Sequence, residues 1–167
     1  MGRQNQVVTF VEGNGEVGLS NAGLNKMGIN LVANQPYDGV LRVKSNTGAE
    51  TIYLSLRDSK GNVVAEKPYQ LKGDGSYEKV EFELTPSAGD PKGSFGVSLK
   101  EKGEIELGFA FMQPGEWGRV NGLPLRKMMV EALKKQGITA IRYNGSMVDV
   151  GVDTYQYRWK KMMGPVD

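Results

Sequence analysis

Strict alternation of apolar and polar residues is the feature that most constrains this chain. In residues 77–84, YEKVEFEL, the apolar Val80, Phe82 and Leu84 take every second place, and charged residues stand between them. Because successive side chains of a strand point to opposite faces of a sheet, this pattern predicts a strand with one buried face and one wet face. An amphipathic helix would need a period of 3.6 residues instead.

Similar segments follow one another through the first two thirds of the chain. Further strands are expected at residues 7–13, 27–33, 39–45, 50–58, 62–71, 93–99 and 104–111. Turn-forming stretches such as DSKGN, KGDGS and SAGDPKG separate them. Pro68 marks an edge strand or a bulge, because proline cannot donate to a sheet ladder. About eight strands at this spacing predict a mainly β fold, a two-sheet jelly-roll sandwich.

The period changes after Phe111. A loop, MQPGEWGRVNGLP, comes first, and apolar residues then recur at helical spacing at Leu125, Met128, Met129, Ala132 and Leu133. Gly137 is the expected C-cap of that helix, and ITAIRY at 138–143 is expected to be a buried strand.

These elements divide the chain into two parts. With 109–111 as its first strand, the tail has the order of one strand–helix–strand crossover, like part of a (β/α)8 barrel. We therefore expect a sandwich at 1–112 and a barrel-like fragment at 113–167. Because such a tail exposes Met128, Met129, Ile138 and Ile141, it is expected to fold back on the sandwich or to self-associate.

Composition excludes several classes of function. The chain has no cysteine and no histidine, so thiolate, zinc–thiolate and Ser-His-Asp chemistry are absent. A net charge of +2 without a basic stripe argues against nucleic acid as a partner. No apolar run is long enough for a signal peptide or a membrane span. The compartment stays open, and no cofactor is expected.

Two groups of residues are candidates for binding. In the tail, aromatic residues occur together with polar residues of the kind that bind sugar hydroxyls, namely Trp117, Arg142, Asn144 and Trp159. In the sandwich the candidates are outward residues, namely Arg42, Tyr53, Arg57 and either Tyr37 or Tyr69. The alternative is ordinary packing: loop aromatics against a barrel rim, and tyrosines against their cross-strand neighbours.

Acidic residues give weaker signals. Asp149 and Asp153 lie in a glycine-containing loop that does not fix the separation that a glycosidase needs, so solvated carboxylates are favoured and no catalytic residue is assigned. The turns at 12–14 and 74–76 offer oxygen ligands for a structural calcium ion. Their spacing matches no specific calcium loop.

The last third of the chain resembles the α-L-arabinofuranosidases. Their Trp-x-x-Arg-x-x-Gly-Leu loop and Trp-Lys-x-x-x-Gly-Pro segment are matched by Trp117, Arg119 (one position early), Gly122, Leu123, Trp159, Lys160, Gly164 and Pro165. The resemblance implies a carbohydrate-binding-like jelly roll inserted in a (β/α)8 glycosidase barrel. It also implies that Arg142 contacts the sugar, and that the catalytic glutamates lie outside this sequence.

Three hypotheses follow. The first is a non-catalytic, carbohydrate-binding-like module of a glycoside hydrolase that acts on arabinose-containing or related plant cell-wall polysaccharides, in an extracellular or periplasmic compartment. The second is a substrate-contacting segment of an α-L-arabinofuranosidase, through Arg142, Asn144 and Trp159. The third is a structural sandwich without affinity for sugar.

Overall fold

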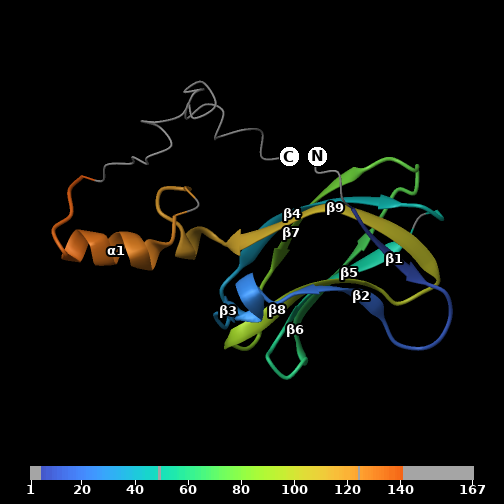
Figure 1. Cartoon of the computed structure of the whole chain (residues 1–167), viewed down its shortest axis with the longest axis horizontal. Coiled ribbons are helices and arrows are strands. Elements are labelled where there is room, and N and C mark those ends of the chain that lie inside the picture. Colours follow the sequence, from blue (N-terminus) through green and yellow to red (C-terminus); the bar gives the residue numbers. More distant parts are fainter. Residues whose placement is uncertain (1–4, 49, 124, 141–167) are drawn as a thin grey trace, which may run out of the picture. The chain divides into compact units, whose positions relative to one another are not determined.

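Two antiparallel sheets form most of the protein (Figure 1). The computed structural model describes residues 5–48, 50–123 and 125–140. One sheet, called the β4 sheet below, contains in spatial order β1 (Gln6–Phe10), β9 (Gly103–Pro114), β4 (Tyr37–Ser45) and β7 (Glu78–Leu84). The other, the β5 sheet, contains β2 (Val17–Asn21), β8 (Asp90–Leu99), β5 (Thr51–Arg57) and β6 (Val63–Gln70), and β3 (Ile29–Leu31) also pairs with β8.

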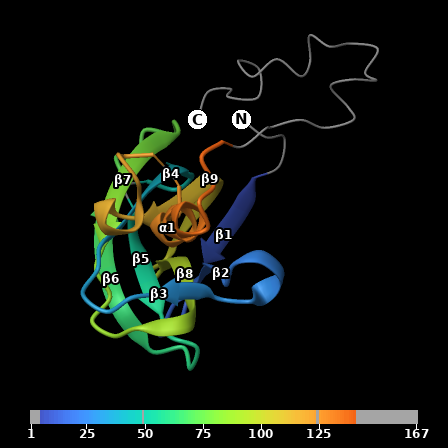
Figure 2. The ribbon, with the colours of Figure 1, turned by 90° about the vertical axis from the view of Figure 1, so that its left-hand side faces the viewer.

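The core lies between the two sheets, which Figure 2 shows as two layers. The side chains that the alternation predicts as inward are buried on both sheets: Leu41 and Val80 on one, Ile52 and Leu54 on the other, expose 0% of their surface. The intervening charged residues of β7 are exposed. This arrangement confirms the predicted jelly-roll sandwich, and it confirms β6, the strand that contains Pro68, as an edge strand.

Strand β2 is an element that the sequence pattern did not predict. Its residues are mostly exposed, so they show little alternation. It nevertheless pairs with β8 over its whole length. A Cβ atom at Gly18 would lie 2.3 Å from the carbonyl oxygen of Val97, so only glycine fits at this point of the strand pair. A short 3-10 helix, η1 (Leu24–Lys26), lies between β2 and β3.

A bulge in β9 overturns one prediction about side-chain direction. Arg42 pairs with Phe109 and Val43 pairs with Leu107, so Gly108 is the extra residue. The insertion shifts the alternation by one position, and Phe111 is 39% exposed rather than inward. Gly108 itself lies beneath the ring of Tyr77, where an added Cβ atom would lie 3.0 Å from a ring carbon.

The predicted helix is present as α1 (Lys127–Lys135). Gly137, with φ of +76°, ends it as predicted. The backbone amide of Gly137 donates a hydrogen bond to the carbonyl of Lys134, and the amide of Ile138 donates one to the carbonyl of Leu133. This pair of bonds is the Schellman arrangement. No helix in the described part of the chain is long and apolar enough to cross a membrane.

The strand–helix–strand expectation is corrected at its first strand. Residues 109–111 belong to β9, which runs antiparallel to both of its neighbours in the sandwich. Ile138–Ala140 follow the helix without strand structure, and the rest of the expected second strand lies outside the described residues. The reason for the error is that an alternating segment fits either kind of sheet, and the sequence alone does not identify its neighbours.

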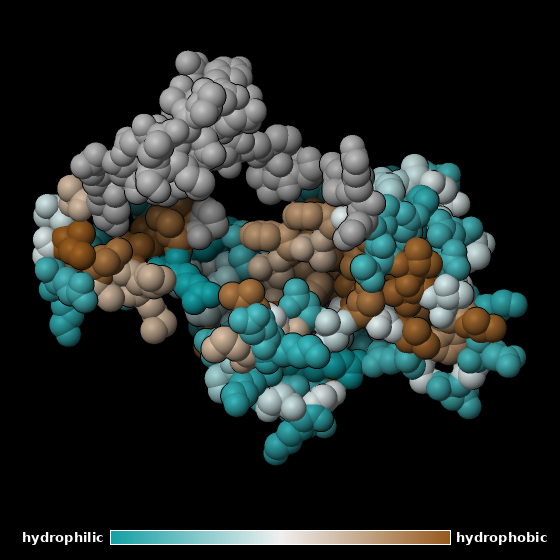
Figure 3. Space-filling model, in the orientation of Figure 1, coloured by the Kyte–Doolittle hydropathy of each residue, from teal (hydrophilic) through white to brown (hydrophobic). Residues whose placement is uncertain are grey.

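The chain separates into two compact units, residues 1–124 and 125–167. The loop after β9, with the 3-10 helix η2 (Glu116–Gly118), therefore clusters with the sandwich, although the sequence placed a boundary after residue 112. In the second unit Met128 and Met129 are 82% and 59% exposed. Figure 3 shows apolar side chains on the surface at the position of α1. The barrel-like character of this unit and its self-association stay predictions.

Candidate functional site

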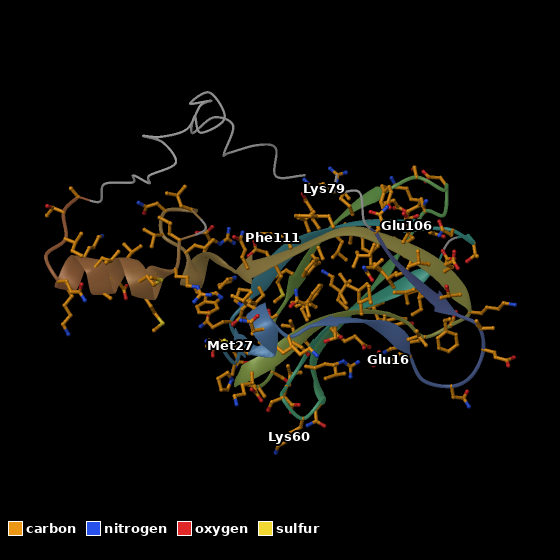
Figure 4. The ribbon with its side chains drawn as sticks, viewed as in Figure 1. Glu16, Met27, Lys60, Lys79, Glu106 and Phe111 are labelled. Carbon is orange, nitrogen blue, oxygen red and sulfur yellow. The ribbon has the colours of Figure 1, made fainter. Side chains whose placement is uncertain are left out.

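The structure separates the sandwich residues that the sequence grouped together. Tyr53 points outward from β5 and Arg42 outward from β4, so they lie on opposite faces of the sandwich. We call the outward side of the β5 sheet the Tyr53 face and that of the β4 sheet the Arg42 face. Figure 4 shows Glu16 at the first and Lys79, Glu106 and Phe111 at the second.

Tyr37 and Tyr69 point inward, although the sequence analysis considered either of them as an outward residue. Tyr37 is 2% exposed; its hydroxyl donates to the carbonyl of Asn30 at 2.8 Å and accepts from the amide of Val32 at 3.0 Å. Burial raises the pKa of Tyr37. Tyr69 pairs with Ile52 and packs against the core. Side chains alternate between the two faces of a strand, and both tyrosines occupy positions that face the core.

Trp117 contacts the end of the sandwich. Its indole N–H donates to the carbonyl of Pro36 at 2.7 Å, and its ring meets that of Tyr37 edge-on, with centroids 5.6 Å apart. Arg119 fixes the same loop, because its guanidinium donates hydrogen bonds to the two carboxylate oxygens of Asp38, at 2.6 and 2.7 Å. Trp117 therefore anchors its loop, and its proposed contact with sugar stays a prediction. Arg142, Asn144 and Trp159 lie outside the described residues.

The Tyr53 face has a floor of small side chains. Tyr53 stands in register with Ser98 of β8, and Ser98 stands in register with Gly18 of β2. In the next row Ser55 stands beside Gly96. An added Cβ atom at Gly96 would lie 2.9 Å from the hydroxyl of Ser55, so this part of the floor has no room for a larger residue.

An ion pair lies across this floor. Arg57 binds the carboxylate of Glu16, and its guanidinium also donates to the carbonyl of Gly61 at 3.1 Å. The hydroxyl of Ser98 donates to the same carboxylate at 2.9 Å. Ser98 and Ser55 are only 6% and 1% exposed although they face outward, as expected if side chains cross above them.

A second ion pair lies beside the tyrosine. The ammonium of Lys100, just after β8, is 2.6 Å from the carboxylate of Glu66 on β6. The same ammonium lies 4.2 Å from the centroid of the Tyr53 ring. The Tyr53 face thus combines an aromatic ring, hydroxyl groups and two cation–carboxylate pairs, which are the kinds of groups that bind sugar rings and sugar hydroxyls.

Sequence reasoning found Tyr53 and Arg57 on this face but missed their partners. Glu16 is 41 residues from Arg57, and Glu66 is 34 residues from Lys100. Nothing local in the sequence indicates these pairs, because the order of strands in the sheet brings them together. Only an outward position in an alternating strand could have suggested Glu66.

The Arg42 face has a different character. Apolar side chains gather over the end of β9 in Figure 3, and Figure 4 shows the exposed Phe111 on this strand. Elsewhere on this face, the carboxylate of Glu106 accepts hydrogen bonds from the ammonium of Lys44 at 2.6 Å and from the hydroxyl of Tyr77 at 2.7 Å. Hydrogen bonds from Lys44, Tyr77 and Asn5 lower the pKa of Glu106 to about 2. Burial and then the bond to Glu106 raise the pKa of Tyr77 to about 12.

A cavity of about 550 Å³ lies at one end of the sandwich, between the turns at 46–50 and 100–103. Its polar lining includes Glu50, Gln70 and Glu104. Burial would raise the pKa of Glu50, but hydrogen bonds, led by those from Ser45 and Thr47, leave it lowered. Thr9 donates to Glu104 at 2.8 Å. These local bonds already engage Glu50 and Glu104, so the cavity is a weaker candidate than the Tyr53 face.

The described residues contain no group of three or more acidic side chains that could hold a metal ion. In one of the turns considered for calcium, Asp74 instead accepts from the amide and the hydroxyl of Ser76, at 2.9 and 2.5 Å. These bonds, led by that of the Ser76 hydroxyl, lower the pKa of Asp74. Asp74 thus stabilises its own turn, as Asx turns commonly do.

Comparisons with known proteins agree on the fold. No family model matches the sequence, and no curated protein matches it. Among solved structures, an arabinose-bound α-L-arabinofuranosidase of glycoside hydrolase family 51 superposes with a TM-score of 0.75 and 22% identity, over 91% of this chain and 26% of that one. A carbohydrate-binding module of family 4 superposes with a TM-score of 0.50 and 14% identity, over 69% of this chain and 74% of the module. The chain thus spans about a quarter of the arabinofuranosidase.

Proposed function

We propose that this chain is a non-catalytic, carbohydrate-binding-like module of a glycoside hydrolase that acts on arabinose-containing or related plant cell-wall polysaccharides. We place the glycan on the Tyr53 face. The likeness in fold to a carbohydrate-binding module and to an arabinose-bound arabinofuranosidase supports this assignment. The sequence motifs around Trp117 and Trp159 point to the same family of hydrolases.

One observation carries the choice of face. Tyr53 is partly exposed in the middle of the β5 sheet, and the partly exposed Glu16–Arg57 pair lies on the same face, above a floor of serine and glycine residues. A sugar ring that stacks on Tyr53 would extend towards the Glu16–Arg57 pair, whose partly exposed carboxylate and guanidinium groups can exchange hydrogen bonds with the sugar hydroxyls. On the Arg42 face, apolar residues stand directly beside the arginine, since Phe109 pairs with Arg42 and Phe111 pairs with Val40.

Calorimetric titration against arabinoxylan, xylan, β-glucan and arabino-oligosaccharides tests the proposal. We expect the unchanged protein to bind at least one of them, and Tyr53→Ala to weaken binding about tenfold or more, the effect of losing a stacking contact of about 1.4 kcal/mol. Arg42→Ala, on the opposite face, is the matched control and should bind normally. Loss of binding in Arg42→Ala alone would move the site to the Arg42 face.

A second candidate function is a substrate-contacting segment of an α-L-arabinofuranosidase. The superposition with the arabinofuranosidase extends over 91% of this chain, which is more than the sandwich strands account for. In that case, substitution of Arg142, Asn144, Trp117 or Trp159 should weaken the binding of arabino-oligosaccharides. Tyr53→Ala should leave that binding unchanged. Absence of binding to every glycan would leave a structural sandwich.

A further inference from the structure

The aromatic ring at the centre of the Tyr53 face is already in contact with another group of the protein. The ammonium of Lys100 lies 4.2 Å from the centroid of the Tyr53 ring. The same ammonium forms an ion pair with the carboxylate of Glu66, at 2.6 Å. Lys100 follows β8 and Glu66 belongs to β6, so their side chains approach each other over β5, the strand between them. The side chains of Lys100 and Glu66 are 35% and 27% exposed, so the pair lies at the surface.

A stacking sugar needs the same place. Carbon atoms in van der Waals contact lie about 3.5–4 Å apart, which is close to the 4.2 Å between the ammonium and the centroid of the ring. We propose that Lys100 covers the Tyr53 ring in the free protein, and that a neutral glycan stacks there only after Lys100 has moved aside. This inference rests on the proposed function and adds a residue that controls its site.

Charge balance on the face favours a neutral ligand. Two cations of the Tyr53 face each have a carboxylate partner, Lys100 with Glu66 and Arg57 with Glu16. An acidic sugar that reached the ring would therefore meet two carboxylates as well as the two cations, without a net attraction. A neutral sugar has only to displace the ammonium.

The cover is weak enough to open. A cation over an aromatic ring and an ion pair are each worth little at an exposed site, and together they correspond to about three- to tenfold in affinity. Salt screens both contacts, so the cover should loosen as ionic strength rises. A neutral glycan should accordingly bind more tightly at high salt, contrary to the behaviour of a ligand held by charge.

Lys100→Met tests the proposal, because it keeps a long apolar side chain and removes the charge. Calorimetric titration with neutral arabino-oligosaccharides and arabinoxylan should show binding about three- to tenfold tighter than that of the unchanged protein. Raising the salt should tighten binding by the unchanged protein and leave the variant unaffected. Lys79→Met, which removes the 3.0 Å pair with Glu81 on the opposite face, is the matched control. Equal or weaker binding by Lys100→Met would overturn the proposal.

Nitration of Tyr53 by tetranitromethane, followed by peptide mass spectrometry, tests the cover without any glycan. Tyr53 should react faster in Lys100→Met and in Glu66→Gln, which frees the ammonium, than in the unchanged protein. Unchanged reactivity would overturn the cover even if glycans bind. Faster nitration without glycan binding by any of the proteins would instead overturn the proposed function, and with it the control of glycan access.

Discussion

The rings of Phe82 and Phe95 stack in parallel across the sandwich, with centroids 5.2 Å apart and planes 4° from each other. Phe82 belongs to β7 in one sheet and Phe95 to β8 in the other, so their contact joins the two layers directly. Each is 6% exposed. The pair is therefore part of the core that holds the sheets together.

Phe95→Ala should lower the free energy of unfolding by about 3–5 kcal/mol, because it removes a buried ring and leaves a cavity opposite Phe82. Urea unfolding, followed by near-ultraviolet circular dichroism, measures the change. Phe111→Ala is the control, since Phe111 is 39% exposed and should cost less than about 1 kcal/mol. Equal losses in the two variants would contradict the described position of Phe95 in the core.

The hydrogen bonds of Glu106 predict acid sensitivity. Its pKa in the folded protein is about 2 against 4.5 for an ordinary glutamate, so ionised Glu106 stabilises the fold above about pH 4.5. That contribution is lost as the pH falls from about 4.5 to about 2. The melting temperature of the unchanged protein should fall more steeply over this range than that of Glu106→Gln. Glu83→Gln, at an exposed position of β7, should keep the steep profile.

The same cluster predicts sensitivity to alkali. The pKa of Tyr77 is raised from 10.0 to about 12, so the neutral phenol is the form that the fold stabilises. This contribution is complete below pH 10 and is lost as the pH rises towards 12. Tyr77→Phe, which has no phenol to ionise, should show a smaller fall in melting temperature between these values. A fall as large as that of the unchanged protein would contradict the prediction.

The contacts of Arg119 predict where a protease cuts. Its side chain is 15% exposed and paired with Asp38, whereas Arg126 is exposed just before α1. Limited trypsin digestion, followed by mass spectrometry, should therefore cleave after Arg126 before it cleaves after Arg119. Asp38→Ala should speed cleavage at Arg119 specifically. Equal rates at both sites in the unchanged protein would show that the loop after β9 is not held by the sandwich.

The sequence by itself determined the sandwich, most of its strands and its core. Alternation over residues 77–84 and its counterparts fixes which side of each strand is buried, because the geometry of a strand is local. The helical period and Gly137 similarly predicted α1 and its end. Local patterns failed at β2, where few residues are buried, and at Gly108, where a bulge shifts the alternation.

The lateral order of the strands belongs to the tertiary structure alone. It put Arg42 and Tyr53 on opposite faces, and it brought Glu16 to Arg57 and Lys100 to Glu66 from distant parts of the chain. An outward residue carries no local signal of its neighbours, because exposed positions tolerate many side chains and pair only through the sheet. The candidate site is for this reason a product of strand order, whereas the core follows from the period of the sequence.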